Sequence, residues 1–339
     1  MHVAVAMSGG VDSSVAAAML VEAGHRVVGV HMDLSPEVGS ADLARAAAEQ
    51  LGIPLQVVDL RDVFQVEVVD YLVGSYLSGL TPNPCVRCNA RVKLGALLEH
   101  TLRLGASHLA TGHYARIGPG PSLHVAADRA KDQTYFLHQV GREVLERVVF
   151  PLGDTTKDAV RERAATLGLT AARRPESQEI CFVPDDDHFR FIGARGAHGA
   201  GDIVDEAGVV LGRHQGFYRY TVGQRRGLGV ALGAPAYVVE VQPETRRVVV
   251  TTDPDRLLAR GLALGDCRWY ELPVADEVVE VQVRYRGRRI RCRVELDEGR
   301  ARVELEEPAR ALAPGQSAVF YRGDLVLGGG VILGREGAA

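Results

Sequence analysis

Short apolar runs alternate with helical patterns through the first part of the chain. The apolar runs at residues 2–6, 26–31 and 54–59 are rich in valine, and SHLATGH (107–113) indicates a further strand. Helical patterns separate the three valine-rich runs, at about 12–23 and 41–51. Because parallel strands need a crossover connection, this alternation indicates an α/β domain with a doubly wound parallel sheet. We expect a loop and a short strand at 117–127, and further helices at 62–78, 88–103, 131–147 and 156–167.

The pattern changes at about residue 195. Short alternating strands follow, such as YVVEV, RRVVVTT and RARVELEE, and they are separated by glycine-containing turns. This texture is typical of small all-β domains and barrels. We therefore predict an α/β domain at residues 1–190, a small β domain at 191–258 and a barrel-like β domain at 259–339.

Composition narrows the class of protein. The 339 residues include no run of about 20 apolar residues, and the N-terminal MHVAVAMSGG lacks the basic region of a signal peptide. We therefore expect a cytoplasmic protein, in which five cysteines favour metal or catalytic roles over a disulfide framework. The net charge of −4 argues against a general nucleic-acid coat, but it allows a local basic face.

A glycine-rich turn follows the first apolar run, in AVAMSGGVDSSVAAAML (4–20). Gly9 and Gly10 allow close approach of a ligand, and the following helix presents unpaired N–H groups that attract anions. Asp12 would repel a phosphate, so it either holds Mg²⁺ or orients a donor. The Walker A lysine is missing. A tight turn with Asp12 as a helix cap is the simpler alternative.

The stretch SGGVDSS (8–14) resembles the PP-loop of ATP pyrophosphatases. Enzymes of that superfamily cleave ATP to AMP and pyrophosphate while they adenylate a substrate oxygen. The resemblance implies ATP and Mg²⁺ as cofactors. It leaves open the nucleophile that then displaces AMP, because ammonia, amines and sulfur all occur among relatives.

Three cysteines are candidates for chemistry. Cys85 and Cys88 lie in TPNPCVRCNARVK (81–93), before a helical pattern at 89–100, and Cys181 lies in SQEICFVPD. We expect the helix dipole to lower the pKa of Cys88. Cys267 and Cys292 fall in strand-like segments and are expected to be buried apolar residues.

Three interpretations of this cysteine trio compete. A structural zinc site has four ligands, so the three cysteines would need a histidine to complete it. A thioredoxin-type redox pair would leave the ATP loop unexplained. Sulfur transfer joins both signals, because sulfur would be the missing nucleophile.

Eight ordered motifs resemble the MnmA family of tRNA-specific 2-thiouridylases. They are AMSGGVDSS (6–14), GLTPNPCVRCNARVK (79–93), ATGHYARI (110–117), KDQTYFL (131–137), SQEICFVPD (177–185), HQGFYRYTVGQRRGLG (214–229), VRYRG (283–287) and PGQSAVFY (314–321). The resemblance implies ATP-dependent thiolation of carbon 2 of the wobble uridine in Lys, Glu and Gln tRNAs. It also implies a sulfur donor, either a cysteine desulfurase or a sulfur-relay protein.

The resemblance assigns roles to residues. Cys181 would carry a persulfide, and Cys88 would be the nucleophile that helps release its sulfur. The nucleotide-binding residues would be Ala6, Met7, Ser8, Gly9, Gly10, Val11, Asp12, Ser13, Met32 and Gly112. The tRNA-binding residues would be Asn83, Pro84, Cys85, His113, Lys131, Asp132, Gln133, Arg284, Tyr285 and Gln316.

Cys85 departs from the family, whose familiar form has aspartate there. Three cysteines can hold a [4Fe-4S] cluster with one iron open to sulfide. We therefore hypothesise that Cys85, Cys88 and Cys181 bind such a cluster. The alternative keeps the persulfide route, with Cys85 as a spare or resolving thiol.

The segment VRYRGRRIRCRV (283–294) is rich in arginine. Strand alternation would place Arg284, Arg286 and Arg288 on one face, where they could contact phosphates. A solvated hairpin paired with acidic neighbours is the simpler alternative. Two other functions also compete: a PP-loop synthetase acting on a small molecule, and a nucleotide-binding regulator with a zinc clip.

Overall fold

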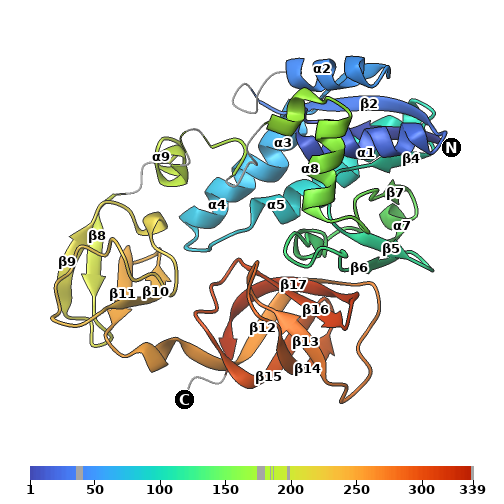
Figure 1. Cartoon of the computed structure of the whole chain (residues 1–339). Helices are drawn as coiled ribbons and strands as arrows, with labels where there is room; N and C mark the ends of the chain where they lie inside the picture. Colours follow the sequence, from blue (N-terminus) through green and yellow to red (C-terminus); the bar gives the residue numbers. More distant parts are fainter. Residues whose placement is uncertain (36–40, 174–179, 184, 186, 197–198, 337–339) are drawn as a thin grey trace. The chain divides into compact units, whose positions relative to one another are not determined.

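The computed structural model describes residues 1–35, 41–173, 180–183, 185, 187–196 and 199–336 (Figure 1). These residues form two compact units. The first unit comprises described residues of 1–69, 85–183 and 323–326, and the second those of 70–84, 184–322 and 327–339. The glycine-rich loop and the cysteine trio therefore belong to the first unit. Our division into three domains cuts the chain differently and stays a prediction.

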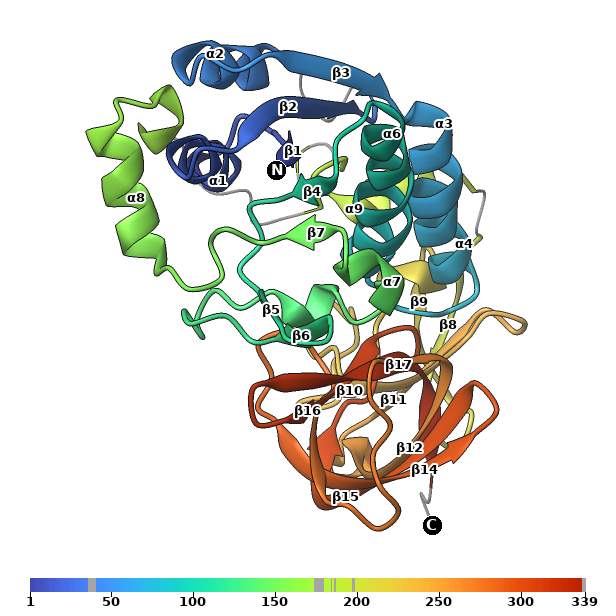
Figure 2. The same cartoon turned by 90° about the vertical axis from the view of Figure 1, so that its right-hand side faces the viewer.

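The first unit is built on a five-stranded parallel sheet in the order β3-β2-β1-β4-β7. These strands are β1 (His2–Ala6), β2 (Arg26–Asp33), β3 (Leu55–Asp59), β4 (His108–Ala110) and β7 (Val148–Val149). Val3, Ala4 and Val5 have no exposed surface, because both faces of the sheet are covered. Figure 2 shows α1 (Val11–Glu22) and α8 (Lys157–Thr166) on one face, and α3 (Arg61–Phe64) and α6 (Leu97–Arg103) on the other. The predicted doubly wound fold is confirmed.

The strand order reverses direction beside β1, since β2 lies on one side of it and β4 on the other. Ligands of open α/β sheets bind at the carboxyl ends of the strands at such a switch point. The glycine-rich loop follows β1, and residues 111–113 follow β4, so both predicted nucleotide-binding segments lie at this edge.

The two long helices predicted at 62–78 and 88–103 are present, and each contains a π-helical segment. One joins α3, η1 (Gln65–Asp70) and α4 (Tyr71–Leu77), and the other joins α5 (Pro84–Arg87), η2 (Cys88–Ala96) and α6. The predicted helices at 41–51 and 156–167 appear as α2 (Asp42–Gln50) and α8. Short π-helical segments are uncommon and often mark functional sites.

The predicted helix at 131–147 is wrong. Only the 3₁₀ turn η3 (Thr134–Phe136) and the short helix α7 (Arg142–Leu145) form there. Asp132, expected in a first helical turn, accepts hydrogen bonds from Ala126 N at 2.9 Å and Thr134 Oγ1 at 2.6 Å. These contacts hold a loop instead of a helix. The preceding stretch forms a hairpin of β5 (Arg116–Gly118) and β6 (Ser122–His124) rather than a single strand.

The second unit is mostly β-structure. A four-stranded sheet in the order β10-β11-β8-β9 contains β8 (Gly201–Val204), β9 (Val210–His214), β10 (Tyr237–Gln242) and β11 (Arg247–Thr251). A barrel follows in the order β12-β15-β14-β13-β16-β17, closed by pairing of β12 with β17. Its strands are β12 (Leu258–Trp269), β13 (Val279–Gln282), β14 (Ile290–Asp297), β15 (Arg300–Arg310), β16 (Ser317–Arg322) and β17 (Leu325–Glu336). This confirms the predicted barrel-like β-structure.

Short helical segments complete the fold: η4 (Thr170–Arg173), α9 (His188–Gly193), η6 (Phe217–Arg219) and η7 (Pro254–Leu257). Within the described residues, no helix is both long and apolar enough to cross a membrane.

Candidate active site

The glycine-rich loop between β1 and α1 is held by its own hydroxyl groups. Ser13 and Ser14 donate hydrogen bonds to Gly10 O at 3.1 and 2.9 Å, and Gly10 N donates to Ser8 Oγ at 3.3 Å. Gly10 is the N-cap of α1, and it has no side chain to occupy the first N–H groups of the helix. Those groups are therefore suited to an anion such as a polyphosphate.

Two glycines bring backbone segments close to this loop. Gly9 has φ +77°, and a β-carbon there would lie 2.4 Å from Leu43 Cβ. Gly112, at the end of β4, packs so that a β-carbon would lie 2.8 Å from both Asp12 C and Ser13 N. Both positions require glycine, and the predicted nucleotide-binding residue Gly112 does lie against the loop.

Met32 lies near the end of β2, the strand paired with β1. The loop itself is tied to β2, because Met7 N donates to Val30 O at 2.8 Å and the His31 ring hydrogen-bonds Met7 O at 2.8 Å. Residues 6–13, Met32 and Gly112 thus gather around one sheet edge. Their role in nucleotide binding remains a prediction.

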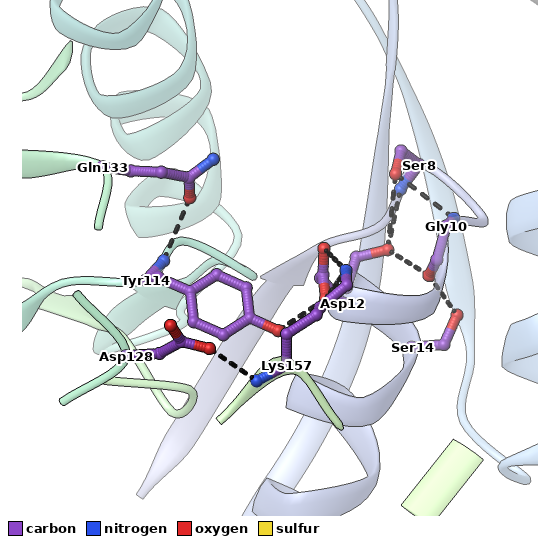
Figure 3. A network of polar contacts seen from close by, with 9 residues as sticks. Ser8, Gly10, Asp12, Ser14, Tyr114, Asp128, Gln133 and Lys157 are labelled. Carbon is purple, nitrogen blue, oxygen red and sulfur yellow. Dashed lines mark hydrogen bonds and ion pairs between the residues drawn. The ribbon is translucent and has the colours of Figure 1, made fainter. Parts of the chain in front are cut away.

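Asp12 is surrounded by donors (Figure 3). Lys157 Nζ lies 2.7 Å from its Oδ1 and 2.8 Å from its Oδ2, and Tyr114 OH donates to Oδ1 at 2.9 Å. Of the two roles left open for Asp12, this geometry favours orienting a donor, because both oxygens already have partners.

Sequence reasoning missed Lys157, because its partner Asp12 is 145 residues away. One signal was available. The chain has 39 lysines and arginines, but lysine occurs only at 93, 131 and 157. A lysine kept in so arginine-rich a chain indicates a position that needs a compact ammonium group.

Cys88 does not begin its helix. The continuous helical stretch starts at Pro84 with α5, and Cys88 opens the π-helical segment η2 one turn later. Its side chain is buried, and burial raises its pKa to about 12 despite the opposing charge of Lys93. The prediction of a lowered pKa is therefore wrong, because desolvation outweighs the helix dipole.

Lys93 interacts electrostatically with all three candidate thiols. Burial alone would lower its pKa, but interactions with Cys88, Cys85 and Cys181 outweigh this and raise it. An α-helix would turn residues five apart by roughly 140°, whereas a π-helix, with about 4.4 residues per turn, leaves them roughly 50° apart. The π-helical winding of η2 therefore puts Cys88 and Lys93 near one face.

The other two thiols are more exposed than Cys88. Desolvation by the surrounding protein raises the pKa of Cys85 and of Cys181, and Lys93 opposes it at both. The segment of Cys181 is anchored by its neighbour Phe182, whose ring packs edge-on against Phe64 with centroids 5.2 Å apart. All five cysteines are described, and no disulfide joins any two of them.

The [4Fe-4S] hypothesis needs three thiols placed as one ligand set. Among the described residues, which include Cys85, Cys88 and Cys181, no three His, Cys, Asp or Glu side chains are placed to hold a metal ion. The trio in this arrangement does not fit a cluster, so we derive no step through one.

Cys292 is fully buried, as predicted, whereas Cys267 is partly exposed.

His113 links the two halves of the site. It follows Gly112 directly, and burial, followed by the charge of Lys93, lowers its pKa to about 3. Its Nδ1 lies 2.7 Å from Thr111 Oγ1. A neutral ring at pH 7 could contact tRNA by hydrogen bonding, but it would not attract phosphate as a cation.

Of the other predicted tRNA-binding residues in the first unit, Gln133 and Asp132 have structural roles. Gln133 Oε1 accepts a hydrogen bond from Tyr114 N at 3.0 Å, beside the Asp12 network. Lys131 is half-buried in the same loop.

In the second unit, two predicted tRNA-binding segments meet. Gln316 Nε2 donates to Thr81 O at 2.9 Å, and Thr81 N donates to Pro314 O at 2.8 Å. These bonds fix the stretch that leads to Asn83 and Pro84. A role of Gln316, Asn83 and Pro84 in tRNA binding stays a prediction.

The predicted alternation of arginines is wrong for residues 284–288. They lie in the connection between β13 and β14, where Arg286 has φ +59°. Arg288 pairs with Glu307 at 2.6 Å and Arg291 with Glu306 at 3.3 Å, as the solvated-hairpin alternative expects. Arg284 and Arg286 are exposed in the turn, where phosphate contact stays a prediction.

Three family models match successive parts of the chain. Residues 1–185 match a family described as "tRNA methyl transferase HUP domain", residues 190–252 its PRC-barrel domain, and residues 259–332 an "Aminomethyltransferase beta-barrel domain". A protein of Geobacter metallireducens, named tRNA-specific 2-thiouridylase MnmA, is 49% identical over 98% of this chain and 96% of its own length. A protein of the same name from Pelobacter propionicus is 47% identical over 100% of both chains.

Proposed function

The chain belongs to the tRNA-specific 2-thiouridylase family, and we infer from this that it is a tRNA sulfurtransferase that uses ATP. The reaction replaces the oxygen at carbon 2 of a uridine by sulfur. We assign the wobble uridine of Lys, Glu and Gln tRNAs as its substrate. The alternative of a synthetase for a small molecule is not favoured by relatives that match over the full length.

One observation carries the mechanism: two consecutive residues join the ATP loop to the thiols. Gly112 packs on the backbone of Asp12, and the next residue, His113, interacts electrostatically with Lys93. Lys93 in turn interacts with Cys88, Cys85 and Cys181. A uridine bound between these groups would meet both an activated phosphate and a sulfur carrier.

In the first step, the carbonyl oxygen at carbon 2 attacks the α-phosphorus of ATP, and pyrophosphate leaves. The N–H groups at the start of α1 would stabilise the departing charge. Mg²⁺ would arrive bound to ATP, as its counterion.

In the second step, a persulfide on Cys181 attacks carbon 2, and AMP leaves with the former carbonyl oxygen. The Cys88 thiolate then attacks Cys181 Sγ. The sulfur–sulfur bond to the substrate breaks, 2-thiouridine is released, and a Cys88–Cys181 disulfide forms. An external thiol must supply two electrons to reduce this disulfide. A cysteine desulfurase or relay protein would load the next persulfide.

The test is to incubate the protein with MgATP, a persulfide donor and unmodified tRNA, and to analyse nucleosides by mass spectrometry. We expect 2-thiouridine to form with iron-free protein. Product that requires anaerobic iron reconstitution would favour the cluster route instead. No product with any donor, although ATP is turned over, would favour a different substrate.

A further inference from the structure

Lys157 and Asp12 form an ion pair beneath the proposed pyrophosphate site. The Lys157 side chain is 5% exposed and the Asp12 side chain 32% exposed. The ammonium group contacts both carboxylate oxygens, and the phenol of Tyr114 donates to one of them. The carboxylate is therefore fixed from two sides.

The backbone of Lys157 is held as firmly as its side chain. Asp128 Oδ2 accepts a hydrogen bond from Lys157 N at 2.9 Å, and Thr156 Oγ1 caps the helix by accepting from Ala159 N at 3.3 Å. Figure 3 shows that the lysine reaches Asp12 from a separate segment of the chain. Such fixed geometry suits a charge that must stay in one place during the reaction.

Asp12 poses an electrostatic difficulty that this arrangement resolves. It lies in the first turn of α1, whose N–H groups form the proposed site for the phosphates of ATP. A carboxylate at this position would repel a polyphosphate, and the loop sequence itself contains no cation to offset it. Lys157 supplies the missing positive charge from α8.

We propose that Lys157 is a positioning residue for ATP cleavage, which neutralises Asp12 and orients it beneath the pyrophosphate loop. The ammonium acts through the carboxylate rather than on the phosphates. This inference rests on the proposed ATP chemistry and adds a residue outside the glycine-rich motif to it.

A double-mutant cycle tests the proposal. MgATP binding is measured by isothermal titration calorimetry, without tRNA, for wild type, Asp12→Asn, Lys157→Met and the double variant. We expect Lys157→Met to weaken binding at least about tenfold, because it leaves a partly buried charge uncompensated. The double variant should recover binding to within about threefold of Asp12→Asn, because the repulsive charge is gone.

Three outcomes would overturn the proposal. Lys157→Met could bind MgATP as wild type does. The double variant could bind as weakly as Lys157→Met, which would mean that Lys157 contacts the phosphates directly. Asp12→Asn alone could bind more weakly than wild type, which would assign Asp12 to Mg²⁺.

Folding is checked by circular dichroism. If Lys157→Met does not fold, the neutral double variant and Asp12→Asn decide the matter by the same criteria. The proposed function is judged separately, because wild-type protein that binds MgATP but makes no 2-thiouridine contradicts that function and leaves this inference standing.

Discussion

Gly112 lies against the backbone of Asp12, at a distance that leaves no room for a β-carbon. This contact joins the end of β4 to the first turn of α1. It places the segment after β4, which contains Gly112 and His113, directly beside the glycine-rich loop.

Replacing Gly112 by alanine should weaken ATP binding. The added β-carbon would meet backbone atoms of Asp12 and Ser13 at 2.8 Å, so the loop must shift. Overpacking of this kind costs about 1–3 kcal/mol, and we expect MgATP affinity to fall roughly tenfold. Gly74→Ala is the matched control, because nothing lies within 4 Å of its β-carbon position. Equal affinity of both variants would contradict the close contact.

Removing the charge of Lys93 should slow the reaction of Cys88 with iodoacetamide. Lys93 opposes the burial that raises the pKa of Cys88 to about 12, so Lys93→Met should raise that pKa further. A rise of about one unit in the pKa of Cys88 lowers its thiolate fraction roughly tenfold. We therefore expect the reaction of Cys88 with iodoacetamide to be roughly tenfold slower at pH 8. Trypsin cleaves after Arg87, so peptide mass spectrometry separates Cys85 from Cys88.

Lys93→Arg keeps the charge and should retain more of the Cys88 reactivity than Lys93→Met. Lys131→Met is the control, because it removes a lysine charge that is not among the groups acting on Cys88. If all three variants react at the wild-type rate, Lys93 does not act on these thiols.

Serine at Cys88 or Cys181 should abolish 2-thiouridine while leaving MgATP affinity within about twofold of wild type, since neither thiol belongs to the ATP loop. Cys267→Ser is the control, because this thiol lies on β12 of the second unit. Full activity of Cys181→Ser would remove the persulfide step from the mechanism.

Acid should destabilise the first unit through its buried histidines. Burial lowers the pKa of His113 and of His138 to about 3, against an ordinary value of 6.5. The unfolded chain therefore binds more protons between pH 6.5 and 3. Stability is full above about pH 6.5 and falls by roughly 1.4 kcal/mol per unit per histidine as the pH drops through this window.

His113→Asn should reduce that pH dependence, measured by urea unfolding followed by circular dichroism at 222 nm. The single tryptophan, Trp269, lies in the second unit, so its fluorescence provides an internal control. An unchanged slope in the dichroism signal would show that His113 is not buried as a neutral ring.

The sequence predicted the fold well where one local pattern decides. Valine-rich strands alternating with helices can bury both faces of a parallel sheet, and residues 2–6 form β1 as expected. The alternation of apolar and charged residues on β15 likewise predicted a strand. Ala301, Val303 and Leu305 are buried there between charged residues. Prediction failed at 131–147, where hydrogen bonds of Asp132 override helical propensity.

Much of the candidate site depends on contacts that no local pattern shows. The Asp12–Lys157 pair joins residues 145 apart, and only the rarity of lysine pointed to it. The environment of Cys88 was misjudged because Pro84, a favoured first residue of helices, starts the helix one turn before it. Burial, which decides its pKa, comes from the assembled fold.

The transfer of one oxygen atom tests the central claim most directly. A tRNA carrying ¹⁸O at carbon 2 of the wobble uridine is thiolated with unlabelled MgATP, and the AMP is analysed by mass spectrometry. Adenylation of the uridine oxygen predicts that one ¹⁸O appears in AMP for each 2-thiouridine formed. Unlabelled AMP, with 2-thiouridine present and the ¹⁸O released to water, would contradict it.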